Sequence, residues 1–416
     1  MLLGGLLLVG WLPFPPVVNY TISLIFASCV YLFLAREIIA FEPGSRLFYT
    51  AIGLALLLRL SFLTATPIGS DDIYRYMWDG KLQTLGINPY RYAPNAPELD
   101  AFHSQRLPSS VNNPDLKSVY FPLGQWVSFA GYELSGENVW GYKLLLFLAE
   151  LATLCGLFLL LKRLNLPSRF ILLYALCPLP VMQFAFDAHI DGIGLPLLIF
   201  GFVSYLGGKK PLSYVLFALS MSIKPVALLL VPILFLREKG AWNKTLTFLV
   251  PVAVISAQFL PYALSSNVFD GLLRFAENWT FNGIVFESLY YCIPDNQRAR
   301  IICAILLSVS VVIVALRKKD LLEAFYLSVL LLLLFSPVVH PWYVSWLVVL
   351  VPAVRRWSGI VFAATVSLTM YTVINYRLHG VWEQSAFILA LEYLPVLVLL
   401  ALEIGYPRTK LAVTNQ

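Results

Sequence analysis

Charged residues are scarce in this chain. Only 12% of its 416 residues are charged and 59% are hydrophobic, whereas soluble globular proteins carry about 25% charged residues. Repeated apolar runs of roughly 17–25 residues have the length of a membrane-crossing helix and are too long for the strands of a membrane barrel. The composition therefore excludes a soluble protein and predicts an all-α polytopic membrane protein.

Cysteine and nucleotide-binding motifs are also scarce or missing. The five cysteines lie mostly within apolar runs and none has metal-ligand spacing, so we infer neither a disulfide framework nor a metal centre. The absence of a glycine-rich phosphate loop argues against a nucleotide substrate. The net charge of +6 requires no nucleic-acid partner, because basic residues fall between the apolar runs and set membrane orientation.

The apolar runs predict about 13–14 transmembrane or re-entrant helices in one domain that covers residues 1–416. They lie at about 2–13, 17–36, 47–66, 139–161, 168–185, 190–206, 211–236, 244–264, 299–316, 321–337, 342–354, 358–375 and 384–405. Basic residues flank both ends of the run 211–236, so we expect a hairpin of two short helices broken at Lys224-Pro225. The positive-inside rule then places both termini in the cytoplasm of a multi-pass protein in the plasma or inner membrane.

Two long polar segments remain outside the membrane in this topology. Residues 67–138 form a first external loop, predicted to be catalytic, and residues 265–298 form a second. Residues 120–134 are apolar but short, and we expect them to form a helix along the membrane surface.

Residues 70–80 (SDDIYRYMWDG) are the first cluster of charge in the chain. If they form a helix, Asp72, Arg75, Tyr76 and Asp79 share one face, at spacings of three, four and seven. Asp71 lies four residues before Arg75, so either acid can pair with that guanidinium. The alternative is a surface helix whose charges merely face water.

Further polar groups occur at the outer ends of predicted spans. Asp187, His189 and Asp191 lie between two apolar runs, where they form either part of a site or an inter-helix hydrogen bond. Lys224, at a helix break, is suited to phosphate, although it can also extend toward the membrane surface.

Aromatic and amide side chains mark three external segments. Residues 86–92 (GINPYRY) suit carbohydrate contact or an ordinary Asn-Pro turn. Residues 274–283 and 336–343 suit substrate contact or an interfacial aromatic belt.

The chemistry of this outer face suits transfer of a sugar from a lipid phosphate. A carboxylate can deprotonate the acceptor hydroxyl, and Lys or Arg can stabilise the departing phosphate. Surface helices can flank a groove for the lipid tail. The candidate phosphate ligands are Lys224, Arg59 and Arg274.

The same segments resemble the motifs of the GT-C superfamily of integral-membrane glycosyltransferases, and most closely bacterial polyprenyl-phosphate-mannose-dependent mannosyltransferase-like proteins. Residues 70–80 with 86–90 are similar to the first-loop motif. Residues 120–123 (YFPL) resemble its Tyr-Pro-Pro-Leu element, and 188–191 (AHID) resemble the second-loop histidine motif. The lysine that follows, Trp279 with Asn282, and 341–343 (PWY) with Trp346 occur in the same order.

The resemblance implies an inverting hexosyltransferase with a polyprenyl-phosphate sugar donor, expected to be mannose, and a lipid or glycan acceptor. The family's two acids are separated by one residue, whereas Asp71 and Asp72 are adjacent, so either is a candidate base. We favour Asp72, because it aligns with Arg75, Tyr76 and Asp79. The expected substrate-binding residues are Arg75, Tyr76, Trp78, Asp79, Asn88, Tyr90, His189, Asp191, Lys224, Trp279, Asn282, His340 and Trp342.

Some superfamily members use a divalent metal at this position; we predict no metal and no other cofactor here. The sequence does not predict an oligomeric state. The alternative function is a transporter or a flippase for lipid-linked sugars, which would require polar residues through the bilayer and inverted repeats.

Overall fold

The computed structural model describes residues 13–405, and these form helices without any β-strand. The first predicted span, at about 2–13, and the tail from 406 to 416 lie almost entirely outside the described residues. The longer helices are α2 (Pro16–Ala40), α3 (Ser45–Ser61), α4 (Asp72–Thr84), α5 (Pro122–Ser135), α6 (Trp140–Arg163), α9 (Asp191–Leu206), α10 (Lys210–Met221), α12 (Ala241–Ala263), α15 (Asn296–Arg317), α16 (Leu321–Phe335), α20 (Met370–His379) and α21 (Ala386–Gly405). The shorter ones are η2 (Pro97–Phe102), η3 (Ser168–Ile171), α7 (Leu172–Ala175), α8 (Pro178–Pro180), η4 (Val181–Phe186), η5 (Pro225–Leu229), α11 (Leu230–Arg237), α13 (Asp270–Asn278), α14 (Ile284–Cys292), α17 (Pro341–Val348), α18 (Val351–Val354), α19 (Trp357–Thr365) and η6 (Val366–Thr369).

Six helices in the described part of the chain are long and apolar enough to cross a membrane: α2, α6, α12, α15, the continuous segment Trp357–His379 and α21. A seventh candidate is the pair Ser168–Ala175 and Pro178–Phe186, which is bent by 50°. The prediction of an all-α polytopic membrane protein is therefore confirmed.

The other predicted spans are shorter helices. Asp191–Leu206, Pro225–Arg237 and Leu321–Phe335 are apolar but have only 10–17 residues each. The expected break at Lys224-Pro225 is present, since α10 ends at Met221 and η5 begins at Pro225. Proline lacks the backbone N–H that would continue a helix, which accounts for the break.

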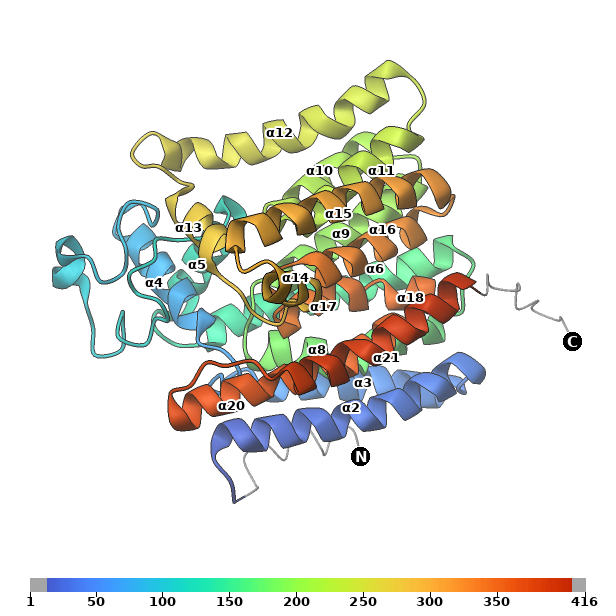
Figure 1. The fold of residues 1–416 in the computed structure, drawn as a ribbon, viewed down its shortest axis with the longest axis horizontal. Coiled ribbons are helices and arrows are strands. Elements are labelled where there is room, and N and C mark those ends of the chain that lie inside the picture. Colours follow the sequence, from blue (N-terminus) through green and yellow to red (C-terminus); the bar gives the residue numbers. More distant parts are fainter. Residues whose placement is uncertain (1–12, 406–416) are drawn as a thin grey trace, which may run out of the picture.

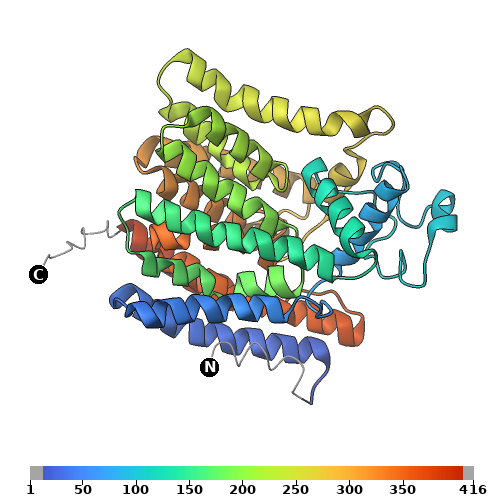
Figure 2. The ribbon, with the colours of Figure 1, turned by 180° about the vertical axis from the view of Figure 1, so that it is seen from behind.

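Most helices lie side by side, and the external loops gather at one end of the bundle (Figure 1). The blue and cyan segment with α4, η2 and α5 projects from that end, and α13 lies beside it. From behind, the long green-teal helix α6 crosses the middle of the bundle (Figure 2). At one edge α12 packs mainly on its neighbours α10 and α11, with much of its apolar surface exposed.

The first external loop has a hydrophobic core of its own. Ile73, Met77 and Trp78 of α4 are fully buried against residues of the following segment such as Leu107. The Trp78 ring also makes an edge contact with His103, at the surface of this core. Trp78 was predicted to bind substrate, but its position is that of a packing residue that holds α4 to the loop.

A buried ion pair joins α3 to α6. Arg59 Nε donates to Glu150 Oε2 at 2.9 Å, and Arg59 Nη1 donates to the carbonyl oxygens of Ala55 and Ala175. The hydroxyl of Tyr174 donates to the other oxygen of Glu150. The Arg59 side chain is 0% exposed, so we do not propose it as the phosphate ligand that the sequence suggested.

Glu150→Ala is predicted to destabilise the fold, because it leaves the Arg59 guanidinium buried without a countercharge. Breaking one partner of a buried pair costs about 3–5 kcal/mol. The measurement is thermal unfolding of the purified protein in detergent. The control is Glu42→Ala, which removes the mostly exposed partner of Arg169 and should cost less than about 1 kcal/mol. Equal losses in the two variants would contradict the prediction.

Candidate active site

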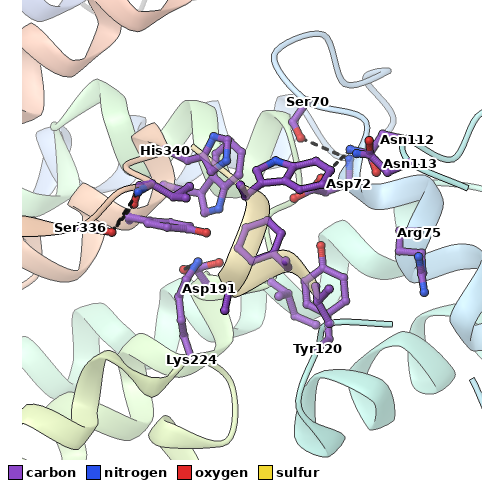
Figure 3. Close-up of a pocket in the computed structure, with 18 of the residues that line it drawn as sticks. Ser70, Asp72, Arg75, Asn112, Asn113, Tyr120, Asp191, Lys224, Ser336 and His340 are labelled. Carbon is purple, nitrogen blue, oxygen red and sulfur yellow. Dashed lines mark hydrogen bonds and ion pairs between the residues drawn. The ribbon is translucent and has the colours of Figure 1, made fainter. Parts of the chain in front are cut away.

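A cavity of about 1010 Å³ lies where the external loops meet the helix bundle. Figure 3 shows Asp72, Asp191, Lys224 and His340 reaching toward it from different segments of the chain. Its lining residues fall within 69–76, 112–121, 190–191, 223–226, 272–280, 329–343 and 373–382, with Arg300 in addition.

Asp72 is the first residue of α4, and its side chain is 18% exposed to the cavity. Its Oδ2 lies 3.5 Å from Nδ1 of His189, and Asn112 donates a hydrogen bond to its Oδ1 at 3.0 Å. Burial by itself would raise the pKa of Asp72, but the contact with His189 and the bond from Asn112 hold it well below the usual range of an aspartate. The helix N-terminus also favours a negative charge here. Asp72 is therefore an ionised, cavity-facing carboxylate at neutral pH.

Asp71 faces a different partner. Nη2 of Arg377, near the end of α20, donates to both oxygens of Asp71 at 2.7 Å. Both residues line the cavity. The adjacent acids thus diverge: Asp71 is paired with a permanent cation, whereas Asp72 contacts an imidazole and an amide.

Trp342 lies between two histidines. Its ring stacks on His189 with centroids 3.6 Å apart and on His340 with centroids 4.3 Å apart. Trp342 and His340 line the cavity, whereas His189 is fully buried and adjoins Asp72. Burial lowers the pKa of His340 to about 3, against the opposing charge of Asp72, so this ring is neutral at physiological pH.

Lys224 lies in the predicted helix break and lines the cavity. Its Nζ is 2.8 Å from Asp191 Oδ1 and 3.3 Å from the centroid of the Tyr343 ring. Nε1 of Trp346 donates to the same Asp191 oxygen at 2.8 Å. The Lys224 ammonium is thus fixed in place by Asp191. It has three N–H donors, and the salt bridge uses one of them, which leaves two for other partners.

Arg75 and Asp79 form an ion pair one turn apart on α4, with Arg75 Nε 2.8 Å from Asp79 Oδ1. Arg75 Nη1 donates to the carbonyl oxygen of Leu116, while its buried Nη2 has no hydrogen-bond partner in the described structure. Ser118 and Gln125 donate to the other Asp79 oxygen. As the spacing predicted, Asp72, Arg75 and Asp79 lie on one face of α4. Asp79 does not line the cavity and instead binds the Arg75 guanidinium.

Apolar side chains line another part of the cavity. Val329, Leu332 and Leu333 come from α16, Val226 from η5 and Leu272 from α13. The cavity therefore joins charged and amide groups of the external loops to an apolar wall of the helix bundle.

Some predicted substrate-binding residues hold loops together instead. Asn88 Nδ2 donates to the carbonyl oxygen of Tyr262 at 2.8 Å and to Ser265 and Ser266 beyond the end of α12. The hydroxyl of Tyr90 donates to the carbonyl oxygen of Tyr120, and its ring packs on α12. Neither lines the cavity, so the arrangement favours a structural turn over carbohydrate contact.

Two further predicted residues of the second external loop lie outside the cavity lining. Arg274 is mostly exposed and pairs with Asp115 at 2.7 Å. Asn282 is buried and donates to Glu392 Oε1 at 2.8 Å, and Tyr393 donates to its carbonyl oxygen. Trp279 and Tyr76, by contrast, line the cavity as expected.

Sequence reasoning missed Asn112 and Arg377. Asn112 lies in an asparagine-rich part of the first loop, 40 residues from Asp72. Arg377 is separated from Asp71 by 306 residues and belongs to no motif. A basic residue in the last turn of a helix was the only available signal for Arg377, and it is common at helix ends.

A family model described as alpha-(1->6)-mannopyranosyltransferase, N-terminal domain, matches residues 8–238, more than half of the chain. The chain belongs to this family. It is a glycosyltransferase of the mannosyl type, which confirms the resemblance drawn from residues 70–80 and 188–191. No curated protein and no solved structure matches the chain.

The matched residues supply Asp71, Asp72, His189 and Lys224, and the unmatched part of the chain completes the cavity with residues such as His340.

Each of the cavity's acids has a partner within the chain. Asp71 is paired with Arg377, Asp72 with His189 and Asn112, and Asp191 with Lys224. Within residues 13–405, no group of three or more His, Cys, Asp or Glu is arranged to hold a metal ion. Hard divalent cations prefer several oxygen ligands around one point, and carboxylates already paired with cations or amides are less available as such ligands.

We therefore predict that mannosyl transfer by the purified protein proceeds at an unchanged rate after incubation with EDTA. The measurement is the initial rate of transfer with and without the chelator. A loss of activity that Mg²⁺ or Mn²⁺ restores would contradict the prediction.

Proposed function

We propose that the protein transfers mannose from a polyprenyl-phosphate donor to a lipid or glycan acceptor at the extracytoplasmic face of the cell membrane, with inversion. Asp72 is the general base, and both termini lie in the cytoplasm. The observation that carries the proposal is the cavity itself, in which an ionised carboxylate, a held lysine and an apolar wall meet.

Asp72 suits the base because its charge is stabilised while its side chain still reaches the cavity. Such a carboxylate is ready to accept the proton that the acceptor hydroxyl releases as the new glycosidic bond forms. Asp71 suits the role less well, since the Arg377 guanidinium occupies both of its oxygens.

A cation on another side of the cavity suits the leaving phosphate. Lys224 approaches from a different segment than Asp72 (Figure 3). Charge-assisted bonds from such a group stabilise the negative charge that develops on the phosphate. A base and a leaving group on different sides of the sugar are what inversion requires.

The apolar wall suits the lipid tail of the donor. Val226, Val329, Leu332 and Leu333 line the cavity and belong to the helix bundle, so a polyprenyl chain would contact them while the phosphate stays with Lys224. The polar lining comes from the first loop with α4 and from helix ends and breaks such as Asp191 and Lys224, whereas a transporter needs a polar path through the bilayer. This favours the transferase over the transporter alternative.

Asp72→Asn is predicted to lower kcat by about 10²–10⁴-fold, because the amide cannot accept the proton. The assay is transfer of radiolabelled mannose from polyprenyl-phosphate mannose by purified protein, with a nucleoside-diphosphate mannose as the comparison donor. Asp71→Asn should retain more activity than Asp72→Asn, and Asp100→Asn, at an exposed position of the same loop, should match the wild type. Turnover of Asp72→Asn near the wild-type value would reject this base, and transfer only from the nucleotide sugar would reject the donor.

His189→Gln is predicted to move the acidic limb of the pH profile to higher pH. The base works when ionised, so kcat/KM falls as the pH drops through the pKa of Asp72, which His189 lowers. Without the imidazole, burial dominates and this pKa rises. The measurement is kcat/KM between about pH 4 and pH 8, where the wild type should show no acidic limb from Asp72 and His189→Gln should show one, with the exposed His379→Gln as control. An unmoved acidic limb in His189→Gln would contradict the assignment.

A further inference from the structure

Asp187 is a buried carboxylate beside the site that the mechanism above does not use. It is 1% exposed and follows η4 directly. Its Oδ1 accepts hydrogen bonds from the backbone N–H groups of Ile68 at 3.1 Å and Gly69 at 2.9 Å, and its Oδ2 accepts one from the hydroxyl of Tyr20 at 2.6 Å. Nε2 of Gln183 donates in turn to the Tyr20 oxygen. Two of these bonds hold the backbone just before Asp71 and Asp72, and the third ties Asp187 to Tyr20 of α2.

Lys143 of α6 fastens the same two segments from the other side. Its Nζ donates to the carbonyl oxygens of Phe62 and Ala65, which follow the end of α3. It also donates to the carbonyl oxygen of Phe186, the residue before Asp187. The stretch 62–69 is therefore bound to the turn 186–187 through two buried ionisable side chains.

The geometry around Gly69 is tight. A β-carbon at Gly69 would lie 2.4 Å from Oδ2 of Asp187 and 2.9 Å from the Tyr20 ring. The backbone of the first loop thus approaches the carboxylate as closely as a residue without a side chain allows. A displacement of Asp187 would leave little room for the present path of this backbone.

The two chain segments joined by this contact lead directly to Asp72, the proposed base, and to His189. Gly69 precedes Asp72 by three residues, and Asp187 precedes His189 by two. Ala188, between Asp187 and His189, has a positive φ of 62°. Residues other than glycine rarely adopt this conformation, so the surrounding contacts must stabilise it. His189 N–H donates to the carbonyl oxygen of Gln183 at 2.9 Å, which fixes the ring 3.5 Å from Asp72.

We propose that Asp187, held by Tyr20, is a positioning residue that sets the distance between Asp72 and His189. The inference rests on the proposed role of Asp72 as the base. Asp187 acts through the two amide N–H groups that it binds and does not touch the substrate. Its loss therefore lowers turnover and raises the pKa of the base, while donor binding by Lys224 and the apolar wall remains.

The sharpest test is a pair of single-hydroxyl deletions on α2. Tyr20→Phe removes the bond to Asp187, and Tyr31→Phe removes a bond of the same length, because each hydroxyl donates at 2.6 Å. Both tyrosines are 0% exposed, so the two hydroxyls are equally buried. The acceptor of Tyr31 is the carbonyl oxygen of Leu173, outside the cavity lining. We expect Tyr20→Phe to lower kcat about tenfold with little change in KM and to shift the acidic limb of kcat/KM upward, because misplacement of catalytic groups acts on turnover. Tyr31→Phe should do neither.

Substitutions of Asp187 test the same bonds directly. Asp187→Ala removes the acceptor and should lower kcat about 10²-fold, the scale of a misplacement of about 1 Å. Asp187→Asn keeps one oxygen that can accept from both amides, and should restore most of that loss. Such a rescue indicates that the acceptor, not the charge, sets the position.

Hydrogen–deuterium exchange of the intact protein supplies a readout that does not depend on activity. The amides of Ile68 and Gly69 should exchange faster in Tyr20→Phe and Asp187→Ala than in the wild type. In Tyr31→Phe their exchange rates should equal those of the wild type. The inference is overturned if these amides keep their protection, or if Tyr20→Phe loses no more turnover than Tyr31→Phe. Failure of the proposed function appears elsewhere, as wild-type turnover in Asp72→Asn.

Discussion

Buried polar groups in a membrane protein must find their partners within the chain, and Asp187 and Asp191, at the two ends of the turn between η4 and α9, meet this constraint. Asp187 binds the backbone of the first loop, His189 adjoins Asp72, and Asp191 holds Lys224. A buried group left unpaired costs about 1–3 kcal/mol, so each contact favours one arrangement of the loops. The left-handed conformation of Ala188 allows these side chains to diverge toward separate partners.

The cavity is assembled from both halves of the chain. The matched family region, 8–238, supplies the acid pair and Lys224, while the later helices supply the Trp342 stack and Arg377. The isolated bridge between Phe281 and Val338 ties the second external loop to the segment before α17. The site is therefore completed only when helices distant in the sequence pack together, and a fragment of the chain would lack one wall of it.

Local spacing predicted what a helix or a helix break imposes. The face shared by Asp72, Arg75 and Asp79 follows from 3.6 residues per turn, and the break at Lys224-Pro225 follows from the missing proline N–H. Spacing did not distinguish Asn88 as a loop anchor from Asn88 as a sugar ligand, because an Asn-Pro turn has the same composition in both cases. Likewise Arg59 was a polar residue in an apolar helix, and its partner Glu150 lies 91 residues away.

Composition and periodicity by themselves determined that this is a helical membrane protein with a cluster of charge at residues 70–80, since both properties depend on residues close in the sequence. Tertiary structure decided which partners the two acids have. Asp71 and Asp72 are identical in type and adjacent, and only packing gives one an arginine from α20 and the other an imidazole, an amide and the open cavity. The physical reason is that the ionisation and reach of a carboxylate depend on the charges and hydrogen bonds around it, and these come from segments that the sequence order does not bring together.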